Sequence, residues 1–504
     1  MIDSKRIAKN TGFLYVRMLL IMAVALYTSR VVLDVLGVDD YGLYNLVGGI
    51  VGMLAFLNGT LSTATSRFLT FDIGIGDFKR LKQTFSTTFF AHLGLGVVVV
   101  LIMETVGLWF VYNKAVIPVG RFDATLWVFH ISVVTVLVTF TQVPYTSLII
   151  AHEQMKAFAY ISLLEAVLKL GIAFLIAFSP MDKLVYYAIL MFVSQFFVAM
   201  IYRSYCYKHW TESHLSKEVS FSTLKSLMSF SGWNIIAHLA ETLRIQGLTT
   251  LFGMFFQPFV IAAQSVSTQL SHGITSFTNN FRMAINPQII KLFATKQYEE
   301  SKKLTLESSI YVFELYLLFG IPIFLLIEPI MHLWLKEIPQ YGIAFSQCII
   351  VSAMFGVFSS GFYTPLTAAG KLKGNSIAAL FICGSQFVIA YILLKLGFDV
   401  MWVQYSYIVI AIIFSLIIKP YLLIREVGYK VSDFVVCYKK AVAIFFLSFA
   451  SPFALSLFVD VNTIVGFLGV GFVSVFSVVV VSYMFLSKEI KLKLNTIIAR
   501  KMKR

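Results

Sequence analysis

The sequence predicts an all-helical polytopic membrane protein with about fourteen transmembrane helices. Hydrophobic residues make up 59% of the 504 residues and charged residues only 13%, which is far from the balance of a soluble domain. The apolar residues form long stretches, and the basic residues gather in every second gap between them. Because a helix needs ~20 mainly apolar residues to cross a bilayer, the stretches indicate membrane spans and the gaps indicate loops.

Fourteen stretches are long enough to cross a bilayer as helices. The first follows a basic start, is ~22 residues long and lacks a small-x-small cleavage site, so we expect a retained span and not a signal peptide. In chain order, the expected spans are residues 12–33, 41–64, 85–110, 124–149, 158–178, 184–202, 227–252, 258–285, 305–328, 342–368, 375–394, 402–424, 441–459 and 463–486.

The basic residues orient these spans. Of the 40 Lys and Arg residues, 29 lie in every second gap, 6 lie in the alternate gaps or, like Arg30, at the end of a stretch next to one, and 5 lie deeper inside the stretches. Short basic loops stay in the cytoplasm, so both termini are expected there, which requires an even number of spans. The net charge of +15 is spread over the cytoplasmic segments and forms no single patch, so we expect anionic lipid head groups as partners and no nucleic acid.

The loops count against an enzyme. Every expected extracytoplasmic loop is short, which leaves no room for a catalytic domain. No phosphate-binding loop is present, because Gly370-Lys371 is preceded by Pro365 where the motif needs its first glycine. The eight histidines show no convincing metal-ligand spacing. We therefore expect a protein without a cofactor, and coupling to H⁺ or Na⁺ stays open.

Ionisable residues inside membrane spans are costly and mark functional sites. In the first span, Arg17 and Arg30 are thirteen residues apart, which is ~20 Å along a helix and on different faces. Both are near a membrane boundary, where long basic side chains reach water, and Arg30 has Asp34 four residues away. In the fifth span, Glu165 and Lys169 are also four residues apart, and an intrahelical ion pair is the favoured interpretation.

The seventh span carries a polar stripe. Asn234, His238 and Glu241 follow one another at steps of 4 and 3, and Arg244 lies one further turn along, near mid-span. An arginine at this depth cannot easily reach water. A binding role for Arg244, with Glu241 holding the guanidinium until a ligand displaces it, is favoured over a self-neutralising ion pair.

The eighth span carries a second stripe with a strict helical period. Its polar residues recur at steps of 4, 3, 4, 3 and 4, so they share one helical face. Two consecutive polar helices indicate a water-lined cleft, although hydroxyl and amide side chains also join neighbouring helices for ~1 kcal/mol each. The residues of this stripe are Gln264, Thr268, Ser271, Thr275, Thr278 and Arg282.

Repeated landmarks indicate an internal duplication in parallel orientation. It predicts an N-terminal lobe of residues 1–215, a C-terminal lobe of 216–424, and residues 425–504 with the last two spans and a basic tail. Repeats of this kind are typical of transporters whose substrate site lies between rocking lobes. Gly37 and Arg67 of the first half correspond to Gly253 and Arg282 of the second half, and Pro144 corresponds to Pro365. The corresponding residues are 215 to 221 positions apart. Arg67 and Arg282 would then flank a cytoplasmic entrance, although ordinary anchoring by basic residues is the alternative.

Three segments resemble the polysaccharide-exporter branch of the MOP superfamily, relatives of the MATE exporters and the lipid II flippases. They are TSR at 28–30 followed by LGVDDYGLYNL at 36–46, FSGWN at 230–234, and PLTAAGKLK at 365–373. The arrangement of six, six and two spans is similar to the same branch over essentially the whole chain. The resemblance implies two six-helix lobes around a central cationic cavity, in a MATE-like fold.

The resemblance also implies a function and a site. The expected protein moves undecaprenyl-pyrophosphate-linked oligosaccharide repeat units across the bacterial inner membrane for O-antigen, capsule or exopolysaccharide synthesis, alongside polysaccharide-assembly proteins. Arginine suits this cargo because its planar fork binds phosphate through two hydrogen bonds and keeps its charge. The expected cavity residues are Arg244, Glu241, His238, Asn234, Gln264, Thr268, Ser271, Thr275, Arg282, Arg30, Arg17, Arg67, Glu165 and Lys169.

Two other functions compete with this one. A MATE-type cation-coupled exporter of small organic molecules is the alternative within transport. Residues 12–33 contain no Asp or Glu, whereas many MATE exporters have a carboxylate in the first lobe. A membrane-embedded glycosyltransferase or polymerase is the enzymatic alternative, and the short outer loops and the lack of paired carboxylates argue against it.

Overall fold

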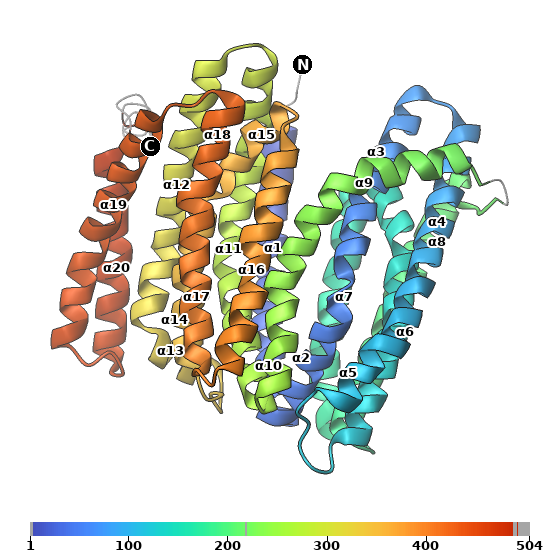
Figure 1. Ribbon diagram of the computed structural model, residues 1–504, viewed down its shortest axis with the longest axis horizontal. Coiled ribbons are helices and arrows are strands. Elements are labelled where there is room, and N and C mark those ends of the chain that lie inside the picture. The colour runs from blue at the N-terminus through green and yellow to red at the C-terminus, as the bar shows by residue number, and fades with distance from the viewer. Residues whose placement is uncertain (1–3, 217–218, 487–490, 492–504) are drawn as a thin grey trace. The chain divides into compact units, whose positions relative to one another are not determined.

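The computed structural model describes residues 4–216, 219–486 and 491, which form helices joined by short loops (Figure 1). Those residues contain no β-strand. The first half of the chain consists of α1 (Ser4–Leu36), α2 (Val38–Gly52), α3 (Ala55–Ile75), α4 (Phe78–Ile102), η1 (Met103–Gly107), α5 (Leu108–Asn113), α6 (Phe122–Ala151), α7 (Met155–Leu175), η2 (Ile176–Phe178), α8 (Lys183–His209) and η3 (Thr211–Ser213).

The second half has the same character. It consists of α9 (Phe221–Thr242), η4 (Leu243–Gly247), α10 (Leu248–Phe255), α11 (Pro258–Ala294), α12 (Tyr298–Leu325), α13 (Ile327–Trp334), α14 (Gly342–Ser359), η5 (Ser360–Phe362), α15 (Tyr363–Ala368), α16 (Leu372–Lys395), α17 (Val400–Ile412), η6 (Ile413–Ile418), α18 (Lys419–Val427), α19 (Val431–Phe458) and α20 (Ile464–Phe485).

Local sequence explains where several helices begin and end. Asp77, Asp182 and Thr463 are N-cap residues of α4, α8 and α20, and their side-chain oxygens accept hydrogen bonds from backbone amides of the first turn. Gly76 ends α3 and Gly428 ends α18 in the left-handed conformation, with φ of 79° and 81°, which glycine adopts without a steric cost.

The predicted fold class is confirmed, but the number of spans is not. Eleven helices of the described part are long and apolar enough to cross a membrane, or twelve if the bent pair α2 and α3 counts as one span. The predicted spans 227–252 and 258–285 coincide with α9 to α10 and with α11, which are not among the eleven. Their polar stripes lower the hydropathy on which such a count depends. Fourteen spans therefore stays a prediction.

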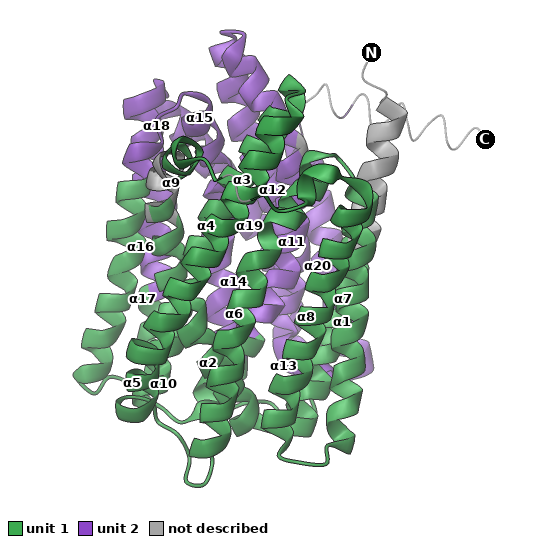
Figure 2. Ribbon diagram, turned by 90° about the vertical axis from the view of Figure 1, so that its right-hand side faces the viewer, with its two compact units in different colours: residues 1–266, 335–342, 376–406 green, residues 267–334, 343–375, 407–504 purple. Residues whose placement is uncertain are grey.

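The chain divides into two compact units, coloured separately in Figure 2. Unit 1 consists of residues 1–266, 335–342 and 376–406, and unit 2 of residues 267–334, 343–375 and 407–504. Unit 1 thus contains the predicted N-terminal lobe together with α9, α10 and most of α16. The predicted division into lobes of 1–215 and 216–424, and the internal duplication, stay predictions.

Each unit has a long central helix. In unit 1, α6 packs against α2, α3, α4, α7 and α8. A buried aromatic and aliphatic core lies around Phe85, Tyr145 and Leu148, and the rings of Phe85 and Tyr145 meet edge to face at 5.2 Å. In unit 2, α12 packs against α19, α20 and η5. These two helices determine which polar side chains come together inside each unit.

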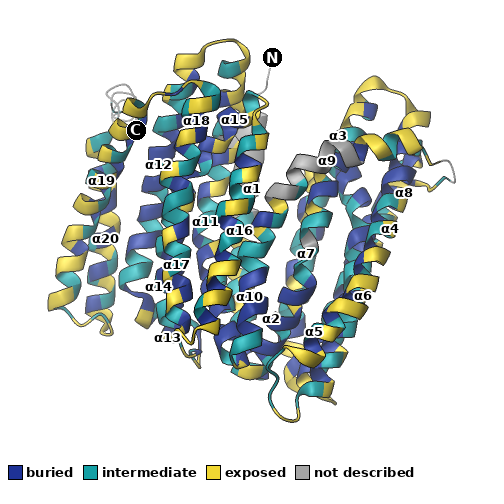
Figure 3. Cartoon of the chain, in the orientation of Figure 1, coloured by how far each residue is buried: buried dark blue, intermediate teal, exposed yellow. Residues whose placement is uncertain are grey.

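Large apolar side chains also cover the outside of the helices. Exposed residues run along α19 and α20 in Figure 3, and they include Phe446, Val465 and Phe472, with Trp127 on α6. A soluble monomer rarely exposes so much contiguous apolar surface. Lipid is the environment in which this surface is stable, so the chain is a polytopic membrane protein.

Candidate functional site

A cavity lined by apolar side chains with several polar groups lies in the helix bundle of unit 1, with a volume of about 280 Å³. Six helices of the first half of the chain enclose it, so it belongs to one compact unit. Its lining residues are Tyr44, Gly48, Val51 and Gly52 from α2, Leu54 before α3, Asn58 from α3, Val99 from α4, Ile131, Ser132, Thr135, Val136, Thr139 and Phe140 from α6, Lys169 from α7, and Ala188, Met191, Ser194 and Gln195 from α8.

Helix α6 supplies three of the hydroxyl groups of the cavity. Ser132, Thr135 and Thr139 are spaced by 3 and 4 residues, which places them on one helical face. Thr135 donates its hydroxyl hydrogen to the Ile131 carbonyl at 2.7 Å, and Thr139 donates to the Thr135 carbonyl at 3.0 Å. With their hydrogens used inside the helix, these two hydroxyls have oxygen lone pairs left for donors in the cavity.

One formal charge lies at the wall of the cavity. Among the described lining residues, Lys169 is the only Lys, Arg, Asp or Glu. Its Nζ donates to Oε1 of Glu165 at 2.7 Å, one turn earlier on α7. The intrahelical ion pair that the sequence favoured therefore forms. The paired Lys169 nevertheless lines the cavity, so its ammonium group is within reach of a ligand bound there.

Two polar atoms of the cavity have no hydrogen-bond partner among the described residues. They are Oδ1 of Asn58 and Oγ of Ser194, both buried. Nearby, Gln195 donates from Nε2 to Oε1 of Gln142 at 2.8 Å, which joins α8 to α6. A buried polar atom without a partner costs about 1–3 kcal/mol, so the arrangement fits a cavity that takes up water or a hydroxylated ligand.

The predicted Arg244 lies on η4, a π-helical turn between α9 and α10. Its Nε donates to Oε2 of Glu241 at 2.8 Å, and its Nη2 contacts Oε1 of the same carboxylate. Three-quarters of the Arg244 side chain is covered, whereas Glu241 is 54% exposed. Single π-helical turns occur frequently at functional sites. The Arg244 guanidinium thus makes the two parallel contacts that the prediction required. Here they go to the Glu241 carboxylate, which occupies the position predicted for a phosphate ligand.

Helix α2, which lines the cavity, packs against η4 and α10. Gly52 lines the cavity, and a Cβ atom on Gly52 would lie 3.2 Å from Cδ of Gln246 on η4. Gly49 is equally close to α10, since a Cβ there would lie 2.9 Å from Cγ2 of Thr249. The small-residue face of α2 therefore allows the close approach of η4 and α10.

The polar stripe of α11 is used mainly for packing. Gln264 accepts a hydrogen bond at 2.7 Å from Gln404 on α17, and both are buried. The hydroxyl of Thr275 donates to the Ser271 carbonyl at 2.9 Å, an intrahelical bond. Thr268 is partly buried. The Gln264 contact favours the helix-joining interpretation for that amide, and a binding role for Gln264, Thr268, Ser271 and Thr275 stays a prediction.

Arg282 is placed differently from the expectation for an anchoring residue. It is 7% exposed, and its Nη2 donates to the Val357 carbonyl at 3.2 Å within unit 2. Its Nε is buried without a partner in the described part of the chain. A Cβ on Gly361 would overlap the guanidinium, so a larger residue at this position would displace the arginine side chain. Arg67, its predicted equivalent, is exposed on α3, so ordinary anchoring fits Arg67 and does not fit Arg282.

The remaining predicted residues give no common site. His238 is exposed and Arg30 is partly buried. Asp34, four residues after Arg30, accepts a bond from Nζ of Lys336 at 2.6 Å. The side chains of Arg17 and Asn234 lie outside the described residues.

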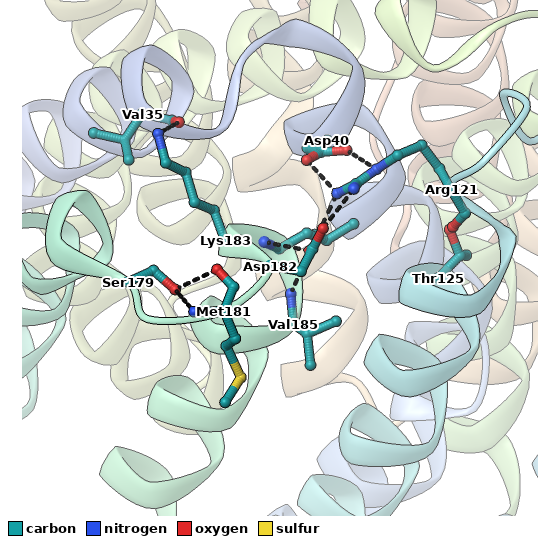
Figure 4. A network of polar contacts seen from close by, with 10 residues as sticks. Val35, Asp40, Arg121, Thr125, Ser179, Met181, Asp182, Lys183 and Val185 are labelled. Carbon is teal, nitrogen blue, oxygen red and sulfur yellow. Dashed lines mark hydrogen bonds and ion pairs between the residues drawn. The ribbon is translucent and has the colours of Figure 1, made fainter.

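A network of ion pairs that the sequence analysis missed lies at the ends of α2, α6 and α8 in unit 1 (Figure 4). Arg121 donates from Nε to Asp40 at 2.8 Å and from Nη1 to Asp182 at 2.5 Å. Lys183 reaches the Val35 carbonyl at 3.4 Å. The bonding partners are 61 to 148 residues apart, so no local pattern could have revealed them.

Apart from Lys169, which was among the predicted site residues, the cavity residues were also missed, but a signal for some of them was present. On α6, Ser132, Thr135, Thr139 and Gln142 follow steps of 3, 4 and 3, the same period that identified the stripe in the eighth span. Asn58 and Ser194 offered no such signal, since isolated polar residues in apolar helices usually join neighbouring helices. Glu314 on α12 is another buried ionisable residue that the sequence analysis did not single out.

No protein-family model and no curated protein matches the sequence, but several solved structures resemble this one. A multidrug resistance MATE family transporter of the MOP superfamily, in an inward-facing conformation, is similar with a TM-score of 0.64 and 13% identity, over 83% of this chain and 95% of that one. The lipid II flippase MurJ, in an inward closed conformation, is similar with a TM-score of 0.64 and 12% identity, over 93% of this chain and 98% of that one.

A third similar structure is the MATE multidrug transporter DinF-BH in complex with R6G. Its TM-score is 0.61 and its identity 16%, over 85% of this chain and 98% of that one. The chain therefore has a MATE-like fold, and these structural neighbours are transporters and flippases of the MOP superfamily. At such low identity the likeness defines the fold, and the cargo must be argued from the site.

Proposed function

We propose that the protein is a flippase that moves lipid-linked oligosaccharide repeat units across the bacterial inner membrane by alternating access, for O-antigen, capsule or exopolysaccharide synthesis. The extent of the match with the lipid II flippase carries this proposal. Residues 431–485, which contain α19 and α20, are 55 of 504 residues or about 11% of the chain. A match over 93% of the chain must include part of this helix pair. Matches over 83% and 85% with MATE transporters have no such requirement.

The polar groups of unit 1 suit such a cargo. A prenyl tail stays in lipid while the phosphate and sugar groups cross through the protein. Arg244 presents a guanidinium already held in the two-bond geometry that a phosphate needs. The cavity of about 280 Å³ offers Lys169, Asn58 and Ser194 for sugar hydroxyls. Ligand pockets usually measure ~300–1,000 Å³, so this cavity would hold a part of the head group and not a whole repeat unit.

One observation favours the alternative, an exporter of small organic molecules. The MATE transporter matches with the same TM-score of 0.64 as the lipid II flippase. A cavity of about 280 Å³ is also large enough for a small molecule. Against an organic cation as cargo, the described lining of the cavity contains no Asp or Glu, and the nearby carboxylate of Glu165 is already paired with Lys169.

A transport assay with both classes of cargo separates the two functions. The purified protein is reconstituted into liposomes that contain a fluorescent undecaprenyl-pyrophosphate-linked oligosaccharide. A membrane-impermeant glycosidase then measures how fast the cargo reaches the other leaflet. Liposomes without protein provide the background rate. We expect flipping of the lipid-linked cargo and no uptake of a fluorescent organic cation, and the opposite pattern would identify a MATE-type exporter.

Variants of Arg244 test the assigned role in the same assay. We expect Arg244→Ala to lower the flipping rate about tenfold or more, because a hydrogen bond to a charged group contributes ~1.5–3 kcal/mol. Arg244→Lys should rescue it only partly, since an ammonium loses the bidentate geometry. Lys302→Ala is the matched control, because Lys302 pairs with Glu299 at the same spacing of three residues. An active Arg244→Ala protein, or an active Glu241→Ala and Arg244→Ala double variant, would contradict the binding role.

A further inference from the structure

Buried polar residues follow one face of α3 away from the cavity of unit 1. Asn58, Thr65 and Asp72 are spaced by seven residues, or about two helical turns, so they share a face. Asn58 lines the cavity. Thr65 is fully buried, and Asp72 is 1% exposed near the far end of the helix. This face therefore carries polar groups from the cavity towards the turn between α3 and α4.

Helix α4 runs back along α3, and two observations fix how the two helices are aligned. Near the turn, the hydroxyl of Thr84 on α4 donates to Oδ2 of Asp72 on α3 at 2.6 Å. At the other end, Val99 of α4 and Asn58 of α3 line the same cavity. The helices therefore pass each other from the turn to the cavity, in contact along their length.

This alignment places Thr65 and His92 at the same level. Thr65 lies seven residues from each end of its polar face, which is ~10.5 Å along α3. On α4, His92 lies eight residues after Thr84 and seven before Val99, which is ~12 Å and ~10.5 Å along the helix. Both residues are thus midway between the turn and the cavity.

The hydroxyl of Thr65 differs from those of the other threonines of α3. Thr60, Thr63 and Thr70 each donate to the carbonyl four residues earlier, at 2.8, 3.2 and 2.7 Å. Oγ1 of Thr65 is buried and makes no hydrogen bond in the part of the chain that the structure describes. Its hydrogen is therefore available to an acceptor outside the helix.

His92 presents the complementary group. Its ring is fully buried, and Nδ1 lies 2.9 Å from the carbonyl oxygen of Thr88. A carbonyl oxygen only accepts, so Nδ1 carries the hydrogen, and Nε2 of the neutral ring then presents a lone pair. Nε2 is buried without a hydrogen-bond partner among the described residues. Helix α4 thus offers an acceptor at the level where α3 offers a donor.

A single water molecule is able to bond both groups, since it can accept from the Thr65 hydroxyl and donate to the histidine. Buried waters in proteins typically bond polar groups that otherwise have no partner. At the cavity, Oδ1 of Asn58 and Oγ of Ser194 are such groups as well. At the turn, Asp72 lies 2.9 Å from Nε of Arg80, whose side chain is 52% exposed. Groups that bind water therefore occur at the cavity, midway along the helices and at the surface.

We propose that a file of water molecules runs between α3 and α4, past Thr65 and His92, and connects the cavity with the end of unit 1 that the basic residues predict to be cytoplasmic. The two helices are in contact and both residues are fully buried, so the file is narrower than any cargo. It allows the cavity to exchange water with the cytoplasm when a polar group enters or leaves. The inference goes beyond the proposed function, because it holds whatever the cargo is.

Hydroxyl-radical labelling by X-ray irradiation tests the proposal in the purified protein. Radiolysis converts water into radicals that oxidise side chains in the immediate neighbourhood, and mass spectrometry gives the rate for each residue. We expect His92 to be oxidised although it is fully buried, and Thr65→Val to lower its rate severalfold. Thr60→Val is the matched control, because Thr60 is buried on the same helix but bonds within it. An unlabelled His92, or a rate that Thr65→Val leaves unchanged, would overturn the proposal.

The connection to bulk water is measured by adding water enriched in the heavy isotope of oxygen immediately before irradiation. We expect the oxygen added to His92 to carry the heavy isotope, because water in an open file exchanges with the solvent. Thr84→Leu places a larger apolar side chain at the turn and should slow this exchange severalfold. If Thr84→Leu leaves the exchange unchanged, water reaches His92 from the cavity alone and the connection to the cytoplasmic end is wrong.

Thermal unfolding provides an independent measurement. In a dry site, Thr65→Val removes a buried hydroxyl without a partner, which raises the stability of the folded protein. In a wet site, the same change removes a hydrogen bond to water, so we expect a lower unfolding midpoint for Thr65→Val than for the wild type. An unchanged or higher midpoint contradicts the water file. If Thr65→Val does not fold, the labelling of His92 in the wild type still decides. None of these measurements uses a cargo, so a protein that flips no lipid-linked sugar can keep the water file, and an active flippase can lack it.

Discussion

Arg121 shows how one side chain can join three helices of unit 1 (Figure 4). Its guanidinium contacts Asp40 at the start of α2 and Asp182 at the start of α8. Partial burial raises the pKa of Asp182. Hydrogen bonds from Arg121 and from the amides of Val185 and Leu184, together with the charge of Arg121, lower the pKa by more than burial raises it. The pKa of Asp182 therefore lies below the ordinary value. Asp182 therefore stabilises the folded protein when it is ionised.

We expect Asp182→Asn to lower the thermal stability of the purified protein by a modest amount, ~1 kcal/mol or less for a partly exposed pair. Asparagine is as good an N-cap as aspartate, so the change removes mainly the ion pair. The pKa of Asp182 is lower in the folded state than in the unfolded state. The contribution of the Asp182 ion pair to stability is therefore complete above the unfolded pKa of ~3.9, and it is lost as the pH falls through the folded-state pKa. Thermal unfolding should show a constant difference from pH 5 to 8 that shrinks below about pH 4. A difference that grows in acid would contradict this account.

Helix α2 illustrates what close packing requires of an element. Its glycines face two different environments, although they lie within a few turns of one another. A Cβ on Gly42 would overlap the carbonyl oxygen of Pro258 at the start of α11, whereas a Cβ on Gly48 would meet no atom within 4 Å. Gly253 of α10 is similarly close to Leu46 of α2. These contacts join the predicted N-terminal lobe to the start of the predicted C-terminal lobe inside unit 1.

Gly42→Ala should therefore destabilise the protein more than Gly48→Ala. Overpacking a tight contact costs ~1–3 kcal/mol, and backbone atoms cannot move aside as a flexible side chain can. Gly48→Ala has space for its methyl group and should gain slightly from the higher helix propensity of alanine. Thermal unfolding of the two purified variants in the same detergent gives the comparison. Equal stability of the two variants would mean that the contact between α2 and α11 is not rigid.

At the scale of the whole molecule, the orientation in the membrane depends on the distribution of basic residues. The apolar helices and the exposed apolar side chains establish a polytopic membrane protein. The bias of 29 basic residues against 6 between alternating gaps predicts which ends are cytoplasmic. We propose that the chain has fourteen spans and that both termini lie inside the cell.

Reporter fusions measure this topology directly. Fusions after residues 118 and 339 should be scored as extracytoplasmic, and fusions after residues 215 and 504 as cytoplasmic. Each fusion needs an abundance control, because a truncated membrane protein is often degraded. If either pair gives the opposite result, the orientation inferred from the basic residues is wrong.

The sequence by itself determined the class of fold and most helix positions. Hydropathy and helical period are local properties, so an apolar stretch such as 463–486 was enough to predict α20 (Ile464–Phe485). The same local information predicted the Glu165 and Lys169 pair, whose partners are one turn apart.

Only the tertiary structure decided which polar residues meet. Gln142 and Gln195 are 53 residues apart and Gln264 and Gln404 are 140 apart, and helix packing sets such pairings. Packing also buried Arg282, which the sequence placed at a cytoplasmic entrance, with anchoring as the alternative. It likewise buried Glu314 on α12. Burial is a property of the neighbours of a residue, and a chain of similar apolar helices does not reveal in one dimension which of them become neighbours.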